Sequence, residues 1–334
     1  MNTNFTPKPG RLMDQVREVL RFHHYSLSTE KSYVQWILRF IRFNNRRHPK
    51  DMGKPEIERY LSHLAINRAV SVATQNQALN AILFLYREVL KSPVEEEIRA
   101  LRSIRPKRLP TVLSKEEIET LFMHLSGKHG LMFRLMYAGG LRVSELLRLR
   151  VHDFDFDNEQ LYIRSSKGNK NRITLFPSVL HNELRIQLQK VRELHEKDLK
   201  NGYGLTILPA ALARKYPNAA KSPGWQFAFP STRICKDPRS DNYVRYHLHE
   251  TALRKILAKA KKRAGIDKHL STHVFRHSFA THMLEDGINI RTVQTLLGHK
   301  DIKTTEVYTH VMNNRISGIK SPLETLRSGE FSST

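Results

Sequence analysis

The chain has 334 residues and a mass of 38.9 kDa, which is enough for two domains of ordinary size, and its 40% hydrophobic content is typical of a globular protein. Lys and Arg outnumber Asp and Glu by 56 to 32, so the formal net charge is +24. Such an excess indicates a polyanionic partner, with nucleic acid as the first candidate and an anionic membrane surface as the second. The sequence has neither an apolar run of about 18 residues nor an apolar signal core, so we expect a soluble, cytoplasmic protein that is not bound to a membrane.

The basic residues are spread over the whole chain. Residues 1–110 carry 20 Lys and Arg against 10 Asp and Glu, which leaves 36 against 22 for the rest. Both parts can therefore contact phosphates. Cys235 is the single cysteine, which excludes an intrachain disulfide framework, and the sequence has no Cys-x-x-Cys pair that would indicate structural zinc.

Residues 11–90 are predicted to form helices. Leu12, Val16 and Leu20 recur at helical spacing, and Ser28-Thr29-Glu30 is expected to open a second amphipathic helix. Two further amphipathic stretches cover 55–67 and 71–90. Four arginines lie mostly off the apolar stripe of the second helix: Arg39, Arg42, Arg46 and Arg47. We interpret them as contacts to a DNA backbone, the alternative being an ordinary solvated helix face.

A change of composition separates this helical part from the rest. The segment SPVEEEIRALRSIRPKRLP contains Pro93, Pro106 and Pro110 and reads as an interdomain linker. We therefore expect a helical DNA-binding domain over 1–92, a linker over 93–110 and a second domain over 111–334. A basic linker of this kind would let two domains close around a duplex.

The second domain is predicted to be mixed, mainly α with a small sheet. Ser114 and Glu117 have the spacing of a capping box at a helix start, and helical patterns continue to VSELLRLR. FDFDNEQLYIR then alternates, SSKGNKNR supplies a turn and ITLF alternates again, which is typical of a β-hairpin.

Clustered carboxylates in this hairpin allow a second interpretation. Asp153, Asp155, Asp157 and Glu159 could belong to a two-metal nuclease. Phe154 and Phe156 alternate with the acids, however, so a strand edge and turn is the simpler interpretation. His247-Leu248-His249 lacks a matching ligand set for zinc. We therefore predict neither a metal nor a cofactor.

Candidate catalytic residues lie in the second domain. Arg142 follows Gly139-Gly140 at the start of a short helix, where a guanidinium could hold two phosphate oxygens. His273 and Arg276 are at i and i+3 of a predicted helix, with Phe275 and Phe279 directed to the core. His299 follows Gly298, a helix C-terminal signal, and Tyr308 is expected on a short helix about two turns later.

A tyrosine nucleophile explains this combination better than separate surface residues do. The phenol titrates near ~10, so its use at neutral pH means offsetting about 4 kcal/mol. Two arginines and nearby imidazoles would favour the phenolate and stabilise a pentacoordinate phosphorane. Lys167, in the hairpin turn, could protonate the leaving 5′ oxygen, with Lys170 as a competing candidate and a further DNA contact; the alternative is a solvated turn lysine.

These residues carry a specific resemblance. GGLRVSELLRL, HVFRHSFATHML and LLGHKDIKTTEVYTHV resemble the motifs of the tyrosine site-specific recombinases over both parts of the chain. The resemblance implies a SAM-like N-terminal DNA-binding domain and an α+β catalytic domain. It also implies a 3′-phosphotyrosyl intermediate, a Holliday junction and a synaptic homotetramer that uses no cofactor. Its catalytic set maps onto Arg142, Lys167, His273, Arg276, His299 and Tyr308.

An insert near 203–232 is similar to the extra element of integron integrases, which act on attI duplexes and folded single-stranded attC hairpins. Leu208-Pro209, Ala213-Arg214-Lys215-Tyr216-Pro217 and Phe229-Pro230-Ser231 carry this likeness, whereas Pro223-Gly224-Trp225 departs from a tandem tryptophan pattern. Tyr216 and Trp225 are candidates for stacking on extrahelical bases, with His247 and His249 as weaker ones. Phe227 and Phe229 are expected to be strand core residues. The alternatives are a Xer-like or phage-type recombinase of double-stranded sites, and a DNA-binding protein that keeps the fold without the chemistry.

Overall fold

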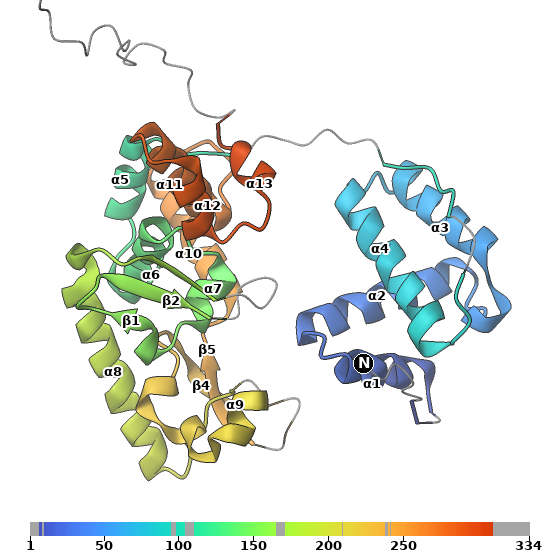
Figure 1. The fold of residues 1–334 in the computed structure, drawn as a ribbon, viewed down its shortest axis with the longest axis horizontal. Helices are drawn as coiled ribbons and strands as arrows, with labels where there is room; N and C mark the ends of the chain where they lie inside the picture. Colours follow the sequence, from blue (N-terminus) through green and yellow to red (C-terminus); the bar gives the residue numbers. More distant parts are fainter. Residues whose placement is uncertain are drawn as a thin grey trace, which may run out of the picture. The chain divides into compact units, whose positions relative to one another are not determined.

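The computed structural model describes residues 7–8, 10–94, 98–103, 110–164, 171–208, 210–237, 240 and 242–309. The chain divides into two compact units, Met1–Arg108 and Leu109–Thr334, and each is considered by itself (Figure 1). The predicted fold class is confirmed: the described residues are mainly helical, with two small antiparallel sheets in the second unit.

The described residues of the first unit form the α-helices α1 (Leu12–Phe22), α2 (Leu27–Phe43), α3 (Lys54–Ile66) and α4 (Val72–Phe84), the last continued by a π-helical turn, Leu85–Val89. Ser26 caps α2 by accepting from the Thr29 N–H, so this helix begins two residues earlier than predicted. Ser71 caps α4 in the same way through Thr74. Apolar faces of α2, α3 and α4 form one buried cluster around Phe40 and Ile57.

Part of the expected linker lies along this unit. The Gln75 side chain donates to the Leu101 carbonyl at 2.7 Å and accepts from the Ser103 N–H at 3.1 Å. Ile98 and Ala100 pack against the same apolar cluster as Phe40. Residues 98–103 are therefore held to the first unit by hydrogen bonds and apolar packing.

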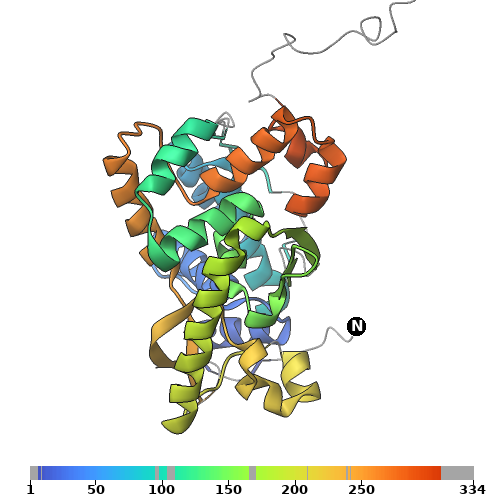
Figure 2. The same cartoon turned by 90° about the vertical axis from the view of Figure 1, so that its left-hand side faces the viewer.

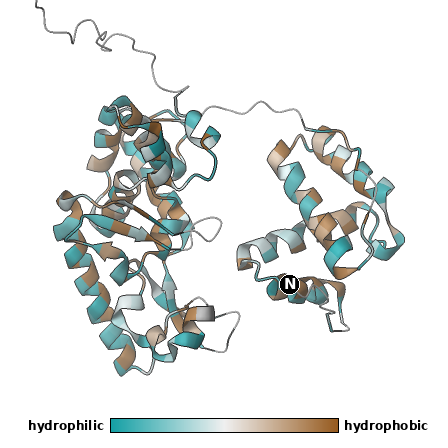
Figure 3. Cartoon of the chain, in the orientation of Figure 1, coloured by the Kyte–Doolittle hydropathy of each residue, from teal (hydrophilic) through white to brown (hydrophobic). Residues whose placement is uncertain are grey.

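The second unit is built around a larger apolar core. Its helices are α5 (Lys115–Met123), α6 (Gly127–Ala138), α7 (Val143–Arg148), α8 (His181–Lys200), α9 (Ala210–Lys215), α10 (Glu250–Arg263), α11 (His273–Glu285), α12 (Ile290–Leu297) and α13 (Lys303–Glu306). The capping box of Ser114 and Glu117 at α5 forms as predicted. Phe133 of α6 and Phe275 of α11 are fully buried at its centre. The long α8 crosses the front of this unit in Figure 2, and its surface carries both apolar and polar residues in Figure 3.

The predicted hairpin is a three-stranded antiparallel sheet, β1 (Phe154–Asp155), β2 (Gln160–Ile163) and β3 (Arg172–Leu175). The first alternating stretch of the predicted hairpin is divided into β1 and β2, because Asp155 forms a tight turn with Asn158. A second sheet pairs β4 (Pro230–Lys236) with β5 (Tyr243–His247). Phe227 and Phe229 are buried as expected, but they precede β4 and are not strand residues; Phe227 makes only an isolated bridge with Arg150.

Candidate active site

Arg142 is fixed at the N-terminus of α7. Gly140 before it has a φ of 58°, and a Cβ there would lie 2.5 Å from the Phe279 ring, so glycine is required at this close approach. The Glu145 carboxylate accepts from the Arg142 backbone N–H at 2.9 Å and from its Nη1 at 2.7 Å. The backbone and the side chain of Arg142 are thereby oriented by one carboxylate.

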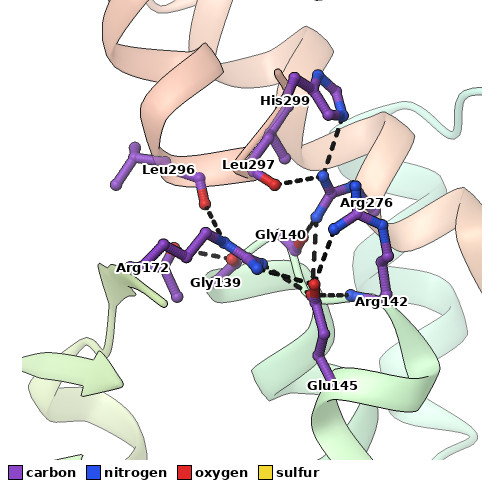
Figure 4. Close-up of polar contacts among 10 residues, drawn as sticks. Gly139, Gly140, Arg142, Glu145, Arg172, Arg276, Leu296, Leu297 and His299 are labelled. Carbon is purple, nitrogen blue, oxygen red and sulfur yellow. Dashed lines mark hydrogen bonds and ion pairs between the residues drawn. The ribbon is translucent and has the colours of Figure 1, made fainter. Parts of the chain in front are cut away.

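Glu145 is the centre of an arginine cluster (Figure 4). Arg172 of β3 donates to both of its oxygens at 2.8 Å, and the Arg276 Nη1 lies 3.9 Å away. Glu145 is 7% exposed, and its burial opposes ionisation. The hydrogen bonds and charge of Arg172, followed by those of Arg142, outweigh that penalty and lower the pKa of Glu145 to about 2. One buried anion thus holds three cations in place.

Arg276 of α11 joins the cluster to α12. It is 2% exposed, and it donates to the Gly140 carbonyl at 2.7 Å and to the Leu297 carbonyl at 2.5 Å. Burial lowers its pKa to about 9, with a further contribution from the charge of Arg142, so the guanidinium remains charged at neutral pH. Arg172 donates to the neighbouring Leu296 carbonyl at 2.8 Å. The two arginines therefore bind the last turn of α12.

His299 lies just beyond α12, as predicted. Gly298 has a φ of 66° at the end of the helix, and a Cβ on it would lie 2.8 Å from the Arg172 side chain. The Arg276 Nη2 lies 3.0 Å from the His299 Nε2, and Thr305 Oγ1 lies 2.9 Å from its Nδ1. Since arginine has no acceptor, Nε2 accepts and Nδ1 donates to Thr305, which defines a neutral imidazole. Burial and the charge of Arg276 lower the pKa of His299 to about 3.

Tyr308 is the last residue of the site in chain order. It is 4% exposed and packs with Phe279, Val293 and Leu297. Its hydroxyl lies 3.1 Å from the His277 Nδ1, and its ring is nearly parallel to that of His299 at 6.3 Å. Burial raises the pKa of Tyr308, although the charges of Arg276 and Arg142 oppose this. The sequence analysis placed Tyr308 on a short helix, but α13 ends at Glu306 and Tyr308 lies in the following turn.

His273 begins α11 at the solvent edge of the site. Its side chain is exposed, whereas Arg276 on the same helix is buried. Partial desolvation and the charges of Arg276 and Arg142 lower the pKa of His273. Four of the predicted residues therefore come together: Arg142, Arg276, His299 and Tyr308. His273 lies close enough for the charges of Arg276 and Arg142 to act on it. Lys167 and Lys170 lie outside the described residues.

The sequence interpretation missed four residues of this site: Glu145, Arg172, His277 and Thr305. Glu145 could have been found, because a carboxylate three residues after Arg142 at a helix start has capping-box spacing. Arg172 gave no comparable signal, since it reaches Glu145 only through the packing of β3 beside α7.

The insert contains a pocket of about 540 Å³ with Tyr216 and Trp225 among its walls, together with Lys215 and Asn218. Tyr216 is 51% exposed and Trp225 is half-buried, with its ring 4.1 Å from that of His152. Aromatic walls of this kind can stack on a base.

Arg150 holds the pocket against the rest of the unit. Its Nη1 donates to Thr206 Oγ1 at 2.8 Å and to the Trp225 carbonyl at 2.7 Å, and its Nη2 donates to the Ile207 carbonyl at 2.6 Å. The guanidinium also lies 3.7 Å from the Phe227 ring centre. Arg150 therefore fixes two segments of the insert at once.

The two candidate histidines have other contacts. His247 is half-buried, with Nδ1 2.7 Å from the Leu248 carbonyl and its ring against Phe227, and burial lowers its pKa to about 4. His249 is exposed and caps α10 through the Thr251 N–H. These contacts give both histidines local structural roles.

The four candidate arginines of the first unit are all exposed. Arg39 lies over the Trp36 ring at 4.9 Å. Arg47 pairs with Glu56 at 3.3 Å, so part of its charge is already balanced.

Two of the hairpin carboxylates, Asp153 and Asp155, have partners within the protein. Asp153 is buried beside Arg164 at 2.5 Å, and Asp155 accepts from the Asn158 turn. In the part of the chain that the structure describes, no three or more His, Cys, Asp or Glu side chains are grouped so that they could hold a metal ion.

None of the helices in the described part of the chain combines the length and the apolar character that crossing a membrane requires.

Comparisons with known proteins extend over both units. The model of the Phage integrase family matches residues 111–315, and that of the phage integrase N-terminal SAM-like domain matches residues 12–96. Proteins of Escherichia coli and Pseudomonas aeruginosa, both named integrase/recombinase, are 43% identical over 332 residues, with 98% of each chain covered. Tyrosine recombinase XerD of Halalkalibacterium halodurans is 31% identical, covering 88% of this chain and 90% of its own. The structure of XerH recombinase bound to its difH substrate has a similar fold, with a TM-score of 0.59, 21% identity and coverage of 90% and 82%.

Proposed function

Because the chain belongs to the phage integrase family of tyrosine recombinases, which cleave and rejoin DNA at specific sites, we propose that it is an integron integrase. In this proposal it integrates and excises gene cassettes at attI duplexes and folded attC hairpins. The observation that carries it is the aromatic pocket of Tyr216 and Trp225 in the insert. Such a pocket has the chemistry to stack an unpaired base, which a hairpin presents and a continuous duplex does not.

The arginine cluster supports the proposed cleavage step. Arg142 and Arg276 bind the nonbridging oxygens of the scissile phosphate, and Glu145 holds Arg142 in place for this. His299 holds Arg276 through Nε2, and His273 faces the phosphate from the edge. The Tyr308 oxygen attacks phosphorus, forms the 3′-phosphotyrosyl bond and releases the 5′ oxygen, which Lys167 protonates. Preorganised cations stabilise the added charge of the phosphorane.

The two units have separate tasks in this proposal. The helical unit, with the exposed Arg39 and Arg42, binds the backbone of the recombination site, and the second unit cleaves it. Four protomers hold two sites together and exchange strands through a Holliday junction. We propose a cytoplasmic location, where such DNA is found.

A Xer-like or phage-type recombinase of double-stranded sites is the second candidate. The 31% identity to a XerD protein favours it, because that similarity also covers most of the chain. The two candidates differ in whether the pocket of Trp225 receives a base. A DNA-binding protein without chemistry would require loss of the catalytic set, which is intact in this sequence.

Trapping a covalent complex on a denaturing gel tests the proposal. The protein is incubated with a labelled attC-type hairpin or with its fully paired duplex, and Tyr308→Phe is the control. A Tyr308-dependent adduct that favours the hairpin supports the integron assignment, whereas one that favours the duplex moves it to a conventional recombinase. Binding of both substrates with no adduct from either would contradict the catalytic proposal.

A further inference from the structure

His277 is placed at the reacting atom of the proposed nucleophile. It directly follows Arg276 on α11, and its Nδ1 lies 3.1 Å from the Tyr308 hydroxyl, with the two rings 5.6 Å apart. The side chain is half-buried and was not among the residues that the sequence motifs singled out. Its contact with Tyr308 arises from the packing of α11 against the turn after α13.

The other polar groups near Tyr308 are not suited to accept its proton. Arg276 has only donors, and both nitrogens of His299 are engaged, Nε2 with Arg276 and Nδ1 with Thr305. His273 is exposed, its nearest ring contact is His277 at 6.2 Å between ring centres, and in the described part of the chain it makes no hydrogen bond to Tyr308. Among the described residues, the imidazole nitrogen that can accept a hydrogen bond from the Tyr308 hydroxyl is Nδ1 of His277.

His277 is neutral in the free protein. Burial lowers the pKa of His277 to about 4, and the charge of Arg276, together with that of His273 whenever it is protonated, acts in the same direction. The Tyr308 hydroxyl contacts His277 from the turn after α13. The charge that His277 carries when protonated also interacts with His299, which lies beyond α12. A neutral imidazole with its proton on Nε2 has a lone pair on Nδ1, directed at the phenol.

We propose that His277 is the general base that accepts the phenolic proton of Tyr308 during strand cleavage. The proton moves from the Tyr308 oxygen to Nδ1 as the oxygen–phosphorus bond forms, and the bond from phosphorus to the 5′ oxygen breaks, with the leaving oxygen protonated by a separate acid. In the reverse, ligation direction, His277 returns the proton to Tyr308. The inference rests on the proposed role of Tyr308 as nucleophile.

A weak base is sufficient for this task. The phenolic proton becomes strongly acidic once its oxygen bonds to phosphorus, so the transfer is downhill late in the reaction. The bound phosphate is an anion and favours the imidazolium that results. Arg276, which lowers the basicity of His277 in the free protein, is partly neutralised by the same phosphate.

Single-turnover cleavage of a nicked suicide substrate tests the inference in the full-length protein. We compare His277→Phe, which removes the acceptor, with His277→Asn, which keeps a hydrogen-bonding group near the Nδ1 position but cannot take a proton. Both are expected to cleave at least about 100-fold more slowly than the unaltered protein. DNA affinity and melting temperature are measured alongside, so that a folding defect is recognised by loss of binding.

Replacing Tyr308 by 3-fluorotyrosine supplies the readout that a structural role would not change. The fluorinated phenol is more acidic, so it should accelerate cleavage more in His277→Phe than in the protein with His277. A substrate with a 5′-bridging sulfur, a better leaving group, should leave the His277→Phe defect in place, because that sulfur relieves the need for the acid and not for the base.

The outcomes distinguish a failure of the proposed role of His277 from a failure of the proposed role of Tyr308. Cleavage by His277→Phe at the unaltered rate, or full activity of His277→Asn, would overturn the role of His277 as proton acceptor. Equal acceleration by 3-fluorotyrosine with and without His277 would also overturn it. A covalent adduct formed by Tyr308→Phe would instead overturn the role of Tyr308 itself.

Discussion

Replacing Glu145 by Gln removes the one negative charge at the centre of the arginine cluster. The amide keeps one acceptor oxygen for Arg142 or Arg172, but it offers two N–H groups where the carboxylate offered lone pairs. The guanidiniums of Arg142, Arg172 and Arg276 then lie close together without a counter-charge. We expect the second unit to lose stability and the site to lose its fixed geometry.

The size of the effect follows from the ionisation of Glu145. A tenfold change in an ionisation constant corresponds to about 1.4 kcal/mol, so lowering the pKa from 4.5 to about 2 stabilises the fold by about 3 kcal/mol. This agrees with the roughly 3–5 kcal/mol typical of breaking a buried ion pair by removing one partner. Because the folded pKa is below the ordinary value, the stabilisation is fully present above pH 4.5 and disappears as the pH falls toward 2.

Tryptophan fluorescence can follow the second unit alone. Trp36 lies in the first unit and Trp225 in the second, so a Trp36→Phe background leaves Trp225 as the reporter. At pH 7 we expect Glu145→Gln to lower the melting temperature of that unit by about 6–12 °C, at roughly 2–4 °C per kcal/mol. Glu183→Gln is the matched control, since Glu183 forms an exposed ion pair with Arg134 and should cost less than about 1 kcal/mol.

The pH dependence gives the decisive comparison. Histidines with lowered pKa values, such as His277 and His299, destabilise both proteins below about pH 6.5 and cancel in the difference. The difference in melting temperature between the unaltered protein and Glu145→Gln should therefore be constant above pH 4.5 and decrease below it. Equal melting temperatures at pH 7, or a difference that does not change down to pH 3, would refute the role of Glu145 as the anion that stabilises the cluster.

Three further predictions concern DNA and the insert. Arg150→Met leaves the Thr206 hydroxyl and two carbonyls without their donor, so limited trypsin digestion should cut the insert faster and hairpin cleavage should fall more than duplex cleavage. Trp225→Ala should weaken hairpin binding by about 1–3 kcal/mol in a gel-shift titration and leave duplex affinity unchanged. Arg39→Ala and Arg42→Ala should each reduce the slope of log affinity against log salt by about 0.9, and an unchanged slope would argue against their phosphate contacts.

Periodicity and capping signals in the sequence predicted the helices of the first unit and those around the candidate site, whereas α8 and α10 were not predicted. Apolar spacing places α1 to α4, and Ser114 with Glu117 marks the start of α5, because these patterns depend on local geometry alone. Gly298 likewise marks the end of α12, since a left-handed residue is needed there. Local chemistry of this kind is readable without the fold.

Tertiary packing determines what the sequence could not predict. Arg172 reaches Glu145 across 27 residues, and His277 meets Tyr308 across 31, so neither contact has a local pattern. His247 was a candidate for contacting bases, yet its ring packs against Phe227, which lies 20 residues earlier in the sequence. The candidate catalytic residues could be named from their motifs, whereas the groups that orient them depend on which helices and strands become neighbours.

The two arginines that hold the end of α12 also determine how the segment that carries Tyr308 can open. The segment from α12 to Tyr308 separates from the rest of its unit only if Arg172 releases the Leu296 carbonyl and Arg276 releases the Leu297 carbonyl. Opening should therefore be cooperative, and amide protons over this segment should exchange with deuterium as one group. A phosphate that accepts hydrogen bonds from the Arg276 guanidinium would weaken the bond from Arg276 to the Leu297 carbonyl. By linkage, DNA binding and opening of this segment should then favour each other.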